Sequence, residues 1–160
     1  MEKNKQTDGT VFDPADTADV QAGAALTPEQ IKERADRIFE IMPSREMAEI
    51  MVRELDEKRA RSIKLLYVED QTILADYFVI ATGNSNTQLR SLSGYVEEKL
   101  KKSGVEPLHV EGYNEASWIL MDYAGVIVHL FTPETRQFYN LEKLWSASQE
   151  IDISGMISQD

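Results

Sequence analysis

Cysteine is absent from the 160 residues of this chain. Without thiols the protein cannot contain a disulfide framework, a cysteine-based zinc site or an iron–sulfur cluster. Long hydrophobic runs are also missing, because apolar stretches such as 77–81 and 126–131 are the size of a strand, whereas a membrane helix needs about 20 apolar residues. The N-terminus also lacks the pattern of a secretion signal. These absences predict a cytoplasmic protein.

Basic residues are scarce: 17 Lys and Arg stand against 28 Asp and Glu, which gives a net charge of −11. Since nucleic-acid phosphates are bound mainly by Lys and Arg, this balance disfavours a dominant direct contact with nucleic acid. A negative surface suits a basic protein partner instead, because opposite potentials speed encounter and set orientation. What the chain does contain is 42% hydrophobic residues, including two Trp, six Tyr and five Phe, which is enough for a globular core.

The N-terminal part of the chain divides into two segments. Residues 1–28 combine five acidic and two basic residues with no apolar periodicity, which predicts a disordered arm. Thr27, Pro28 and Gln30 then form an N-cap, a first helical position and a capping-box partner. They predict an additional N-terminal helix within 29–43, which ends near Ile41.

The remaining periodicity predicts alternating helices and strands. Ser44 starts a second helix, strands follow near 63–68 and 76–82, and Ser85 or Asn86 caps a third helix that ends before Gly104. Further strands are predicted at 107–110, 118–122 and 125–131, and a last helix is predicted from Pro133 to Trp145. This order indicates an α/β protein with a single mixed β-sheet of about five strands and helices packed on it. After Ser146 the pattern weakens, and 147–160 is predicted to be a flexible acidic tail.

The turn from Thr82 to Ser85 is the first candidate for chemistry, because it joins a strand to a helix start that could hold a phosphate. It has no Walker lysine and lacks the further glycines of a dinucleotide fingerprint. A helix-capping turn is therefore favoured over phosphate binding.

Metal-dependent or nucleophilic catalysis has equally little support. No Asp-x-Asp or Asp-x-Glu pair lies on a predicted strand, and Glu111 and Asp122 are the only strand-end carboxylates that could converge. The only two histidines, His109 and His129, are interpreted as half-buried strand residues, and neither lies in a recognisable nucleophile context. We therefore expect a protein without catalytic activity, cofactor or metal.

The stretch from Trp118 to Trp145 is rich in aromatic residues. On the predicted strand 118–122, Trp118, Leu120 and Asp122 share one side while Ile119 and Met121 share the other, so both sides are apolar. One side is expected to pack against helices. The other side is covered either by a partner or by more of this chain.

Residues 44–146 resemble the ribosomal silencing factor family, also called the Iojap-like family. The similarity rests on the order and spacing of several short motifs, namely 76–83 with Ser85, then Glu111 and Gly112, then Trp118, Ile119, Leu120, Asp122 and Gly125, then Val126, Val128, His129 and Phe131, and finally Arg136, Tyr139, Leu141, Glu142, Leu144 and Trp145.

The resemblance implies a fold related to the nucleotidyltransferases but without their activity. It also implies binding to the large ribosomal subunit through ribosomal protein L-fourteen, at the face that meets the small subunit. Bound large subunits would then be unable to join small ones, and translation would be repressed when nutrients are limiting. A role in large-subunit biogenesis and a homodimer of the free form are implied as well.

A partner-binding surface follows as a hypothesis from the resemblance and the acidic charge. Its predicted members, which form or brace the surface, are Trp118, Met121, Asp122, His129, Arg136 and Tyr139. Asp122 would offer a carboxylate to a basic partner, and Arg136 would orient the local network. The alternatives that stay open are a nucleotide-binding enzyme of the nucleotidyltransferase type and a dimerisation or scaffold module.

Overall fold

The computed structural model describes residues 26–158, so most of the predicted arm lies outside the described residues. The helices and strands follow each other in the order α2 (Pro28–Ile41), α3 (Ser44–Glu57), β1 (Arg61–Tyr67), β2 (Tyr77–Thr82), α4 (Asn86–Lys101), β3 (His109–Glu111), β4 (Trp118–Asp122), β5 (Val126–Phe131), α5 (Pro133–Tyr139), α6 (Leu141–Leu144) and β6 (Gln149–Ile151). The α/β class predicted from periodicity is confirmed.

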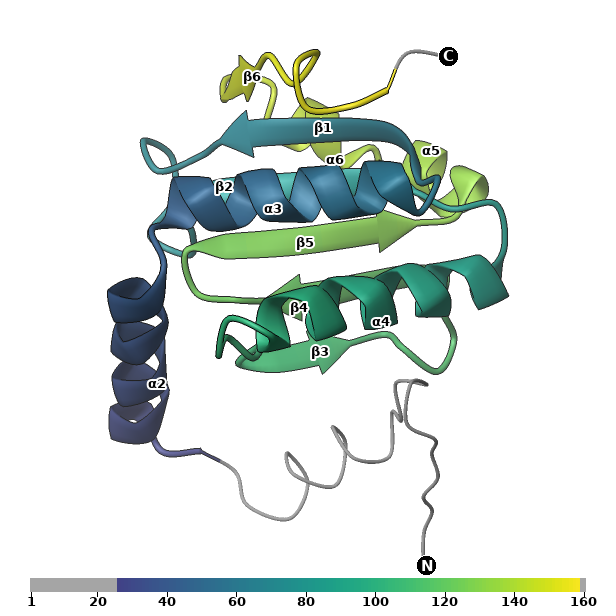
Figure 1. Cartoon of the computed structure of the whole chain (residues 1–160). Coiled ribbons are helices and arrows are strands. Elements are labelled where there is room, and N and C mark those ends of the chain that lie inside the picture. Colours follow the sequence, from purple (N-terminus) through teal and green to yellow (C-terminus); the bar gives the residue numbers. More distant parts are fainter. Residues whose placement is uncertain (1–25, 159–160) are drawn as a thin grey trace, which may run out of the picture.

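All six strands form one sheet in the order β3-β4-β5-β2-β1-β6 (Figure 1). The β2–β5 pair is parallel, and the other four neighbouring pairs are antiparallel. The sheet is therefore mixed, as predicted. The parallel pair arises because the chain crosses over through α4, β3 and β4 before it returns as β5.

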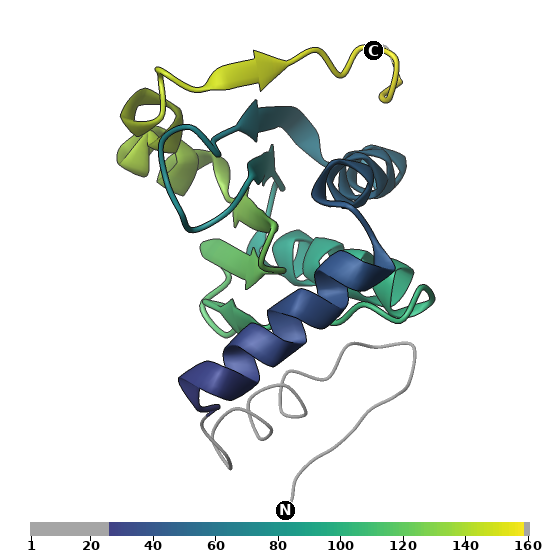
Figure 2. The same ribbon diagram turned by 90° about the vertical axis from the view of Figure 1, so that its left-hand side faces the viewer.

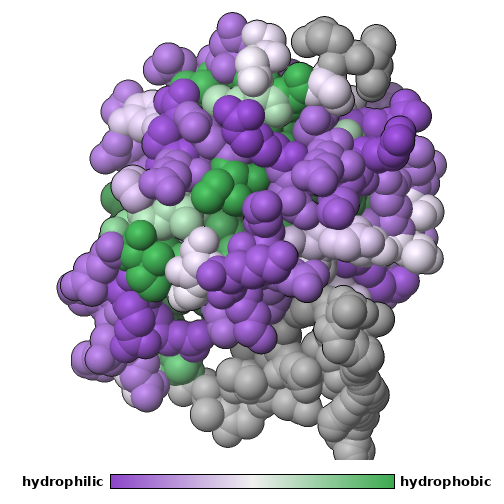
Figure 3. Space-filling view, in the orientation of Figure 1, coloured by the Kyte–Doolittle hydropathy of each residue, from purple (hydrophilic) through white to green (hydrophobic). Residues whose placement is uncertain are grey.

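Helices cover both faces of the sheet. Figures 1 and 2 show α3 and α4 on one face and the short helices α5 and α6 on the other. Strand residues alternate between two buried clusters: Val79, Met121 and Val128 pack beneath α3 and α4, whereas Phe78 and Phe131 pack on the α5–α6 side. The outer surface of the α3–α4 side is mainly hydrophilic, with small hydrophobic patches (Figure 3).

Helix α2 begins as the sequence predicts. The Thr27 hydroxyl accepts a hydrogen bond from the Gln30 backbone, and the Gln30 side chain accepts one from Thr27, which completes the capping box. Only Ile38 in this helix is buried, and together with Met42 it joins the core beneath α3 and α4. The N-terminal half of α2 projects away from the sheet (Figures 1 and 2).

The C-terminal segment differs from the predicted flexible tail. Residues 149–151 form β6, which pairs with β1 so that Ile151 lies opposite Leu65. Ile153 is buried in the core, and the Ser158 backbone donates a hydrogen bond to the Asp56 carboxylate. A strand of three residues is too short to show an alternating pattern, so its pairing with β1 is a tertiary effect.

The predicted last helix is two helices. Asn140 separates α5 from α6 because its backbone adopts a left-handed conformation with φ 48°. Asparagine tolerates this conformation better than most residues, but helical periodicity alone does not show whether the chain uses it. The break turns α6 back over the sheet toward β6 (Figure 1).

Candidate docking surface

The face of the sheet opposite α3 and α4 is only partly covered. Helices α5 and α6 lie beside the strands at one end, and β3 and β4 extend beyond them (Figure 2). The residues at this less covered end, together with two exposed rings of α5, define the candidate docking surface, which consists of His109, Glu111, Trp118, Leu120, Asp122, Phe138 and Tyr139.

An exposed aromatic group marks one end of this surface. Phe138 is 79% exposed and Tyr139 is 48% exposed, although both are large apolar rings. The Tyr139 ring lies 4.8 Å from the Trp118 ring, and the Phe138 ring lies 5.0 Å from that of Tyr139. Aromatic rings in such groups bind partners well, because they bury a large area at a low entropy cost.

A series of ring contacts continues beneath the surface. Trp118 contacts His129 at 5.9 Å, His129 meets Phe78 edge-on at 4.9 Å, and Phe78 meets Trp145 edge-on at 5.0 Å between ring centroids. These residues come from β4, β5, β2 and the end of α6. The contacts connect the exposed rings of α5 to the middle of the sheet.

His129 supports Trp118 from below. The Trp118 indole Nε1 donates a hydrogen bond of 3.2 Å to His129 Nδ1, so the imidazole proton lies on Nε2. Burial lowers the pKa of His129 to about 4, and the ring is neutral at physiological pH. His129 Nε2 is buried and has no hydrogen-bond partner among the described residues. His129 therefore braces Trp118 rather than offering a charge to a partner.

Asp122 lies at the opposite end of the surface. Its carboxylate accepts a hydrogen bond of 2.8 Å from the Ala124 backbone and lies 3.7 Å from His109 Nδ1. Burial raises the pKa of Asp122, while the Ala124 N–H and His109 oppose this effect. His109 Nε2 also lies 2.8 Å from the Glu111 carboxylate. The structure thus brings Glu111 and Asp122 to one face, with His109 between them.

Arg136 holds α5 in place. Its Nε and Nη2 atoms donate to the Glu142 carboxylate at 3.1 and 2.8 Å, and Nη1 donates to the Ser62 carbonyl and the Thr82 hydroxyl. The Arg136 side chain is only 11% exposed. Four of its five donors are thus used within the chain, so Arg136 positions α5 and α6 relative to the sheet.

The structure divides the predicted surface residues into three groups. Trp118, Asp122 and Tyr139 lie at the surface, while His129 and Arg136 brace it from beneath. Met121, which was predicted to form or brace the surface, is fully buried beneath α3 and α4 on the other face of the sheet and is therefore not exposed to a partner there. Alternation along the strand already placed Met121 on the side opposite Trp118.

Two parts of the surface were missed by the sequence reasoning. Phe138 was not among the predicted surface residues, because helical periodicity does not show which side of the short helix α5 meets the sheet. His109 and Glu111 join Asp122 and Leu120 only through the register of β3 with β4. The alternation of a three-residue strand gives no such register.

The turn that could bind a phosphate has little free hydrogen-bonding capacity. The Gly83 N–H donates to the Phe131 carbonyl, and the Asn84 N–H donates to the Gln88 side chain. The Ser85 hydroxyl caps α4 by accepting from the Gln88 backbone. This arrangement agrees with the capping interpretation of the turn.

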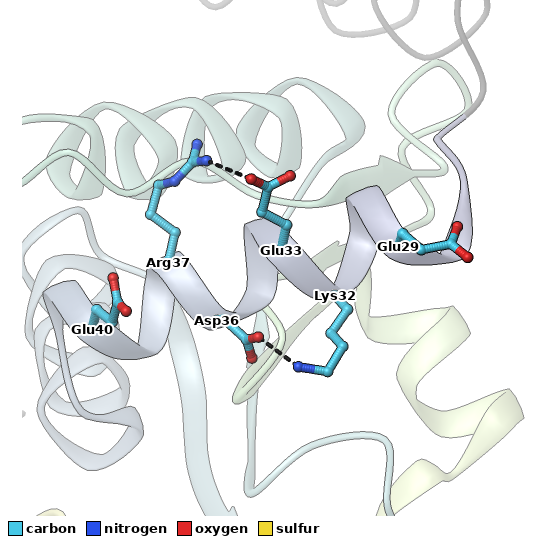
Figure 4. Close-up of a pocket in the computed structure, with 6 residues that line it drawn as sticks. All are labelled: Glu29, Lys32, Glu33, Asp36, Arg37 and Glu40. Carbon is cyan, nitrogen blue, oxygen red and sulfur yellow. Dashed lines mark hydrogen bonds and ion pairs between the residues drawn. The ribbon is translucent and has the colours of Figure 1, made fainter.

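Metal-binding clusters are absent from residues 26–158. No three His, Asp or Glu side chains of these residues lie together in a way that could hold a metal ion. A shallow hollow on α2 is lined only by residues of that helix, namely Glu29, Lys32, Glu33, Asp36, Arg37 and Glu40 (Figure 4). Lys32 pairs with Asp36 and Arg37 with Glu33, so these charges are matched within the helix.

The sequence matches a known protein family. The family described as "ribosomal silencing factor during starvation" matches residues 41–160. This chain belongs to the ribosomal silencing factor family. The match covers β6 and the segment that was predicted to be a tail, and it leaves α2 outside except for its last residue.

Curated relatives carry the same family name. The ribosomal silencing factor of Halalkalibacterium halodurans is 33% identical over 117 residues, which are 73% of this chain and 100% of that protein. That of Bacillus subtilis is 34% identical over 118 residues, which are 74% and 100%. A mouse protein named mitochondrial assembly of ribosomal large subunit protein 1 is 34% identical over 61% of this chain and 44% of its own length.

Solved structures of similar proteins have the same fold. A crystal structure from Chromobacterium violaceum is 31% identical, has a TM-score of 0.64, and is matched over 71% of this chain and 93% of its own. A crystal structure from Bacillus halodurans is also 31% identical, with a TM-score of 0.61 over 68% and 98% of the two chains. None of the helices within 26–158 has the length and apolar character that a membrane span requires.

Proposed function

We propose that this protein binds the large ribosomal subunit through ribosomal protein L-fourteen and sterically blocks joining with the small subunit. Translation is then repressed when nutrients are limiting. Membership of the ribosomal silencing factor family supports this proposal. The name of the mouse relative, which refers to assembly of the large subunit, supports a related role in large-subunit biogenesis.

The observation that carries the proposal is the candidate docking surface. It combines exposed rings at one end, Phe138 and Tyr139, with carboxylates at the other, Glu111 and Asp122. A basic protein can bury its apolar side chains against the rings while its Lys or Arg side chains meet the carboxylates. The net charge of −11 disfavours ribosomal RNA as the main contact.

The rival proposal is an enzyme of the nucleotidyltransferase type that uses the turn from Thr82 to Ser85. The internal hydrogen bonds of Gly83 and Asn84 argue against a phosphate at this turn, because the N–H groups of both residues are already used. We therefore propose a binding protein rather than an enzyme. Calorimetry with nucleotides and magnesium tests the rival, which predicts a saturable heat of binding.

Co-sedimentation with purified large and small subunits tests the proposed function directly. We expect the protein to sediment with large subunits only and to reduce the yield of joined ribosomes in a subunit-joining assay. Sedimentation with neither subunit would contradict the proposal and favour the scaffold alternative.

Two variants test the surface itself. Phe138→Ser removes an exposed ring, and Asp122→Asn removes a charge but keeps an acceptor for the Ala124 N–H. Each is expected to weaken large-subunit binding about tenfold, the size of a typical interface anchor. Glu98→Gln removes the charge of an exposed residue of α4, on the other side of the sheet, and should leave binding unchanged. If all three variants bind large subunits with the affinity of the wild type, this surface is not the binding site.

A further inference from the structure

The loop between β1 and β2 exposes two consecutive aliphatic residues. Ile73 is 103% exposed and Leu74 is 65% exposed, whereas Val68 and Ala75 near the loop ends are buried. Exposed aliphatic pairs of this kind are unfavourable in water, and they commonly mark a contact with another protein. Neither the proposed docking surface nor the packing of the fold accounts for them.

Hydrogen bonds within the loop fix the position of this pair. The Thr72 hydroxyl accepts a hydrogen bond of 3.0 Å from the Leu74 N–H, and the Val68 carbonyl accepts from Gln71 and Thr72. The Val68 N–H in turn donates to the Asp76 carbonyl at 2.8 Å. The loop is therefore organised before a partner arrives, which lowers the entropy cost of binding.

The loop lies on the same side of the sheet as α5 and α6 (Figure 2). Val68 and Ala75 share a buried cluster with Leu141 of α6, and Trp145 packs against this cluster. Leu144, the last residue of α6, is 75% exposed. Ile73, Leu74 and Leu144 thus project from two segments that pack on one common cluster, and we name these three residues the loop contact.

Buried rings connect the loop contact to the candidate docking surface. Trp145 packs on the cluster below the loop contact, and the ring contacts through Phe78 and His129 lead from it to Trp118. The exposed residues at both ends are therefore supported by one series of packed side chains. Packed side chains therefore hold the docking surface and the loop contact in a defined position relative to each other.

The charge near the loop indicates the chemistry of the occupant. Between Lys64 and Arg90 the chain contains no basic residue, but it contains Glu69, Asp70 and Asp76. Glu69 and Asp70 are exposed and lie a few residues before Ile73 and Leu74 in the chain. Apolar side chains beside negative charge fit a basic protein that presents aliphatic groups.

We propose that the loop contact is a second contact for the basic large-subunit protein that binds the candidate docking surface. This inference rests on the proposed function and adds that the partner reaches from Phe138 past α6 to Ile73. The docking surface supplies aromatic anchors, and the loop contact fixes the orientation of the bound protein. A partner held at two points cannot rotate on the sheet, which favours a defined steric block.

The experiment measures the affinity of full-length protein for purified large subunits by co-sedimentation at several salt concentrations. The variants are Ile73→Asp and the milder Ile73→Ser. Because Ile73 is exposed, neither substitution should disturb the fold, which circular dichroism checks. We expect Ile73→Asp to weaken binding about tenfold and Ile73→Ser about threefold, since a partly buried anchor contributes less than a central one. Asp70→Lys should flatten the salt dependence.

Ile31→Asp is the matched control, because Ile31 is 43% exposed on α2, which precedes the family match at residue 41. It should bind as the wild type does. If wild-type protein and both Ile73 variants bind equally well, the proposed role of the loop contact is wrong, whereas the proposed function stands. If the wild type does not bind large subunits, the proposed function itself fails. If Ile73→Asp instead dissociates a dimer and leaves subunit binding intact, the occupant is a second copy and the inference is overturned.

Discussion

Trp118 and His129 are joined across strands β4 and β5 by a hydrogen bond of 3.2 Å from the indole Nε1 to the imidazole Nδ1. The bond fixes the tautomer of His129 and holds the indole in place beneath the Tyr139 ring. A buried neutral histidine thus supports a partly exposed tryptophan on the candidate docking surface. This relationship leads to the first prediction.

The protein should lose stability in mild acid because of His129. Burial lowers the pKa of His129 to about 4 from 6.5, so between these values the unfolded chain binds a proton that the folded chain refuses. The contribution of His129 to stability is therefore fully present above pH 6.5 and is lost as the pH drops toward 4, by up to about 3 kcal/mol. Urea unfolding of wild type and His129→Phe across this range measures the effect, and parallel pH profiles of the two proteins would contradict it.

Glu97 on α4 should act in the opposite direction. Burial, and secondarily the charge of Glu106, raises the pKa of Glu97 to about 7 from 4.5. The folded chain then holds a proton that the unfolded chain loses, so this contribution is present below pH 4.5 and is lost as the pH rises to about 7. Glu97→Gln should raise the free energy of unfolding at pH 8 by up to about 3 kcal/mol and should change it little at pH 4. A variant with no gain at pH 8 would show that Glu97 is ionised without cost.

Replacing Arg136 with lysine should not preserve its role. A single ammonium group cannot contact the Glu142 carboxylate and also reach Ser62 and Thr82 in the geometry of the planar guanidinium. We expect Arg136→Lys to cost about 2 kcal/mol of stability, because partly buried acceptors lose their donors. Hydrogen exchange should then become faster in α5 and α6. Lys143→Ala, an exposed change in α6, is the control, and equal exchange in both variants would disprove the positioning role.

Gly112 should not tolerate a side chain. Its φ of +81° is unfavourable for other residues, and an added Cβ would lie 2.1 Å from the Trp118 carbonyl oxygen. Gly112→Ala should therefore destabilise the protein by more than about 2 kcal/mol. Gly155→Ala is the matched control, since an added Cβ there has no neighbour within 4 Å. Thermal unfolding compares the two, and similar melting temperatures would contradict the expectation.

Much of the fold follows from local features of the sequence. The capping box at Thr27 determines where α2 begins, because its hydrogen bonds lie within one turn of helix. The alternation along 118–122 correctly separates Trp118 and Leu120 from Ile119 and Met121, since side chains of a strand point to opposite faces. The missing cysteines and scarce basic residues limit the chemistry in the same direct way.

Only the tertiary structure decided the rest, because it depends on residues far apart in the chain. The register of β3 with β4 places His109 beside Asp122, and the pairing of β6 with β1 converts a weakly patterned tail into a strand. The left-handed Asn140 divides α5 from α6, and packing of Leu141 on the common cluster brings α6, with the exposed Leu144, to the side of the loop between β1 and β2. The sequence thus determined most of the elements and the sign of the charge. The docking surface arose from how the strands pair, since pairing energy is shared between segments that local patterns cannot connect.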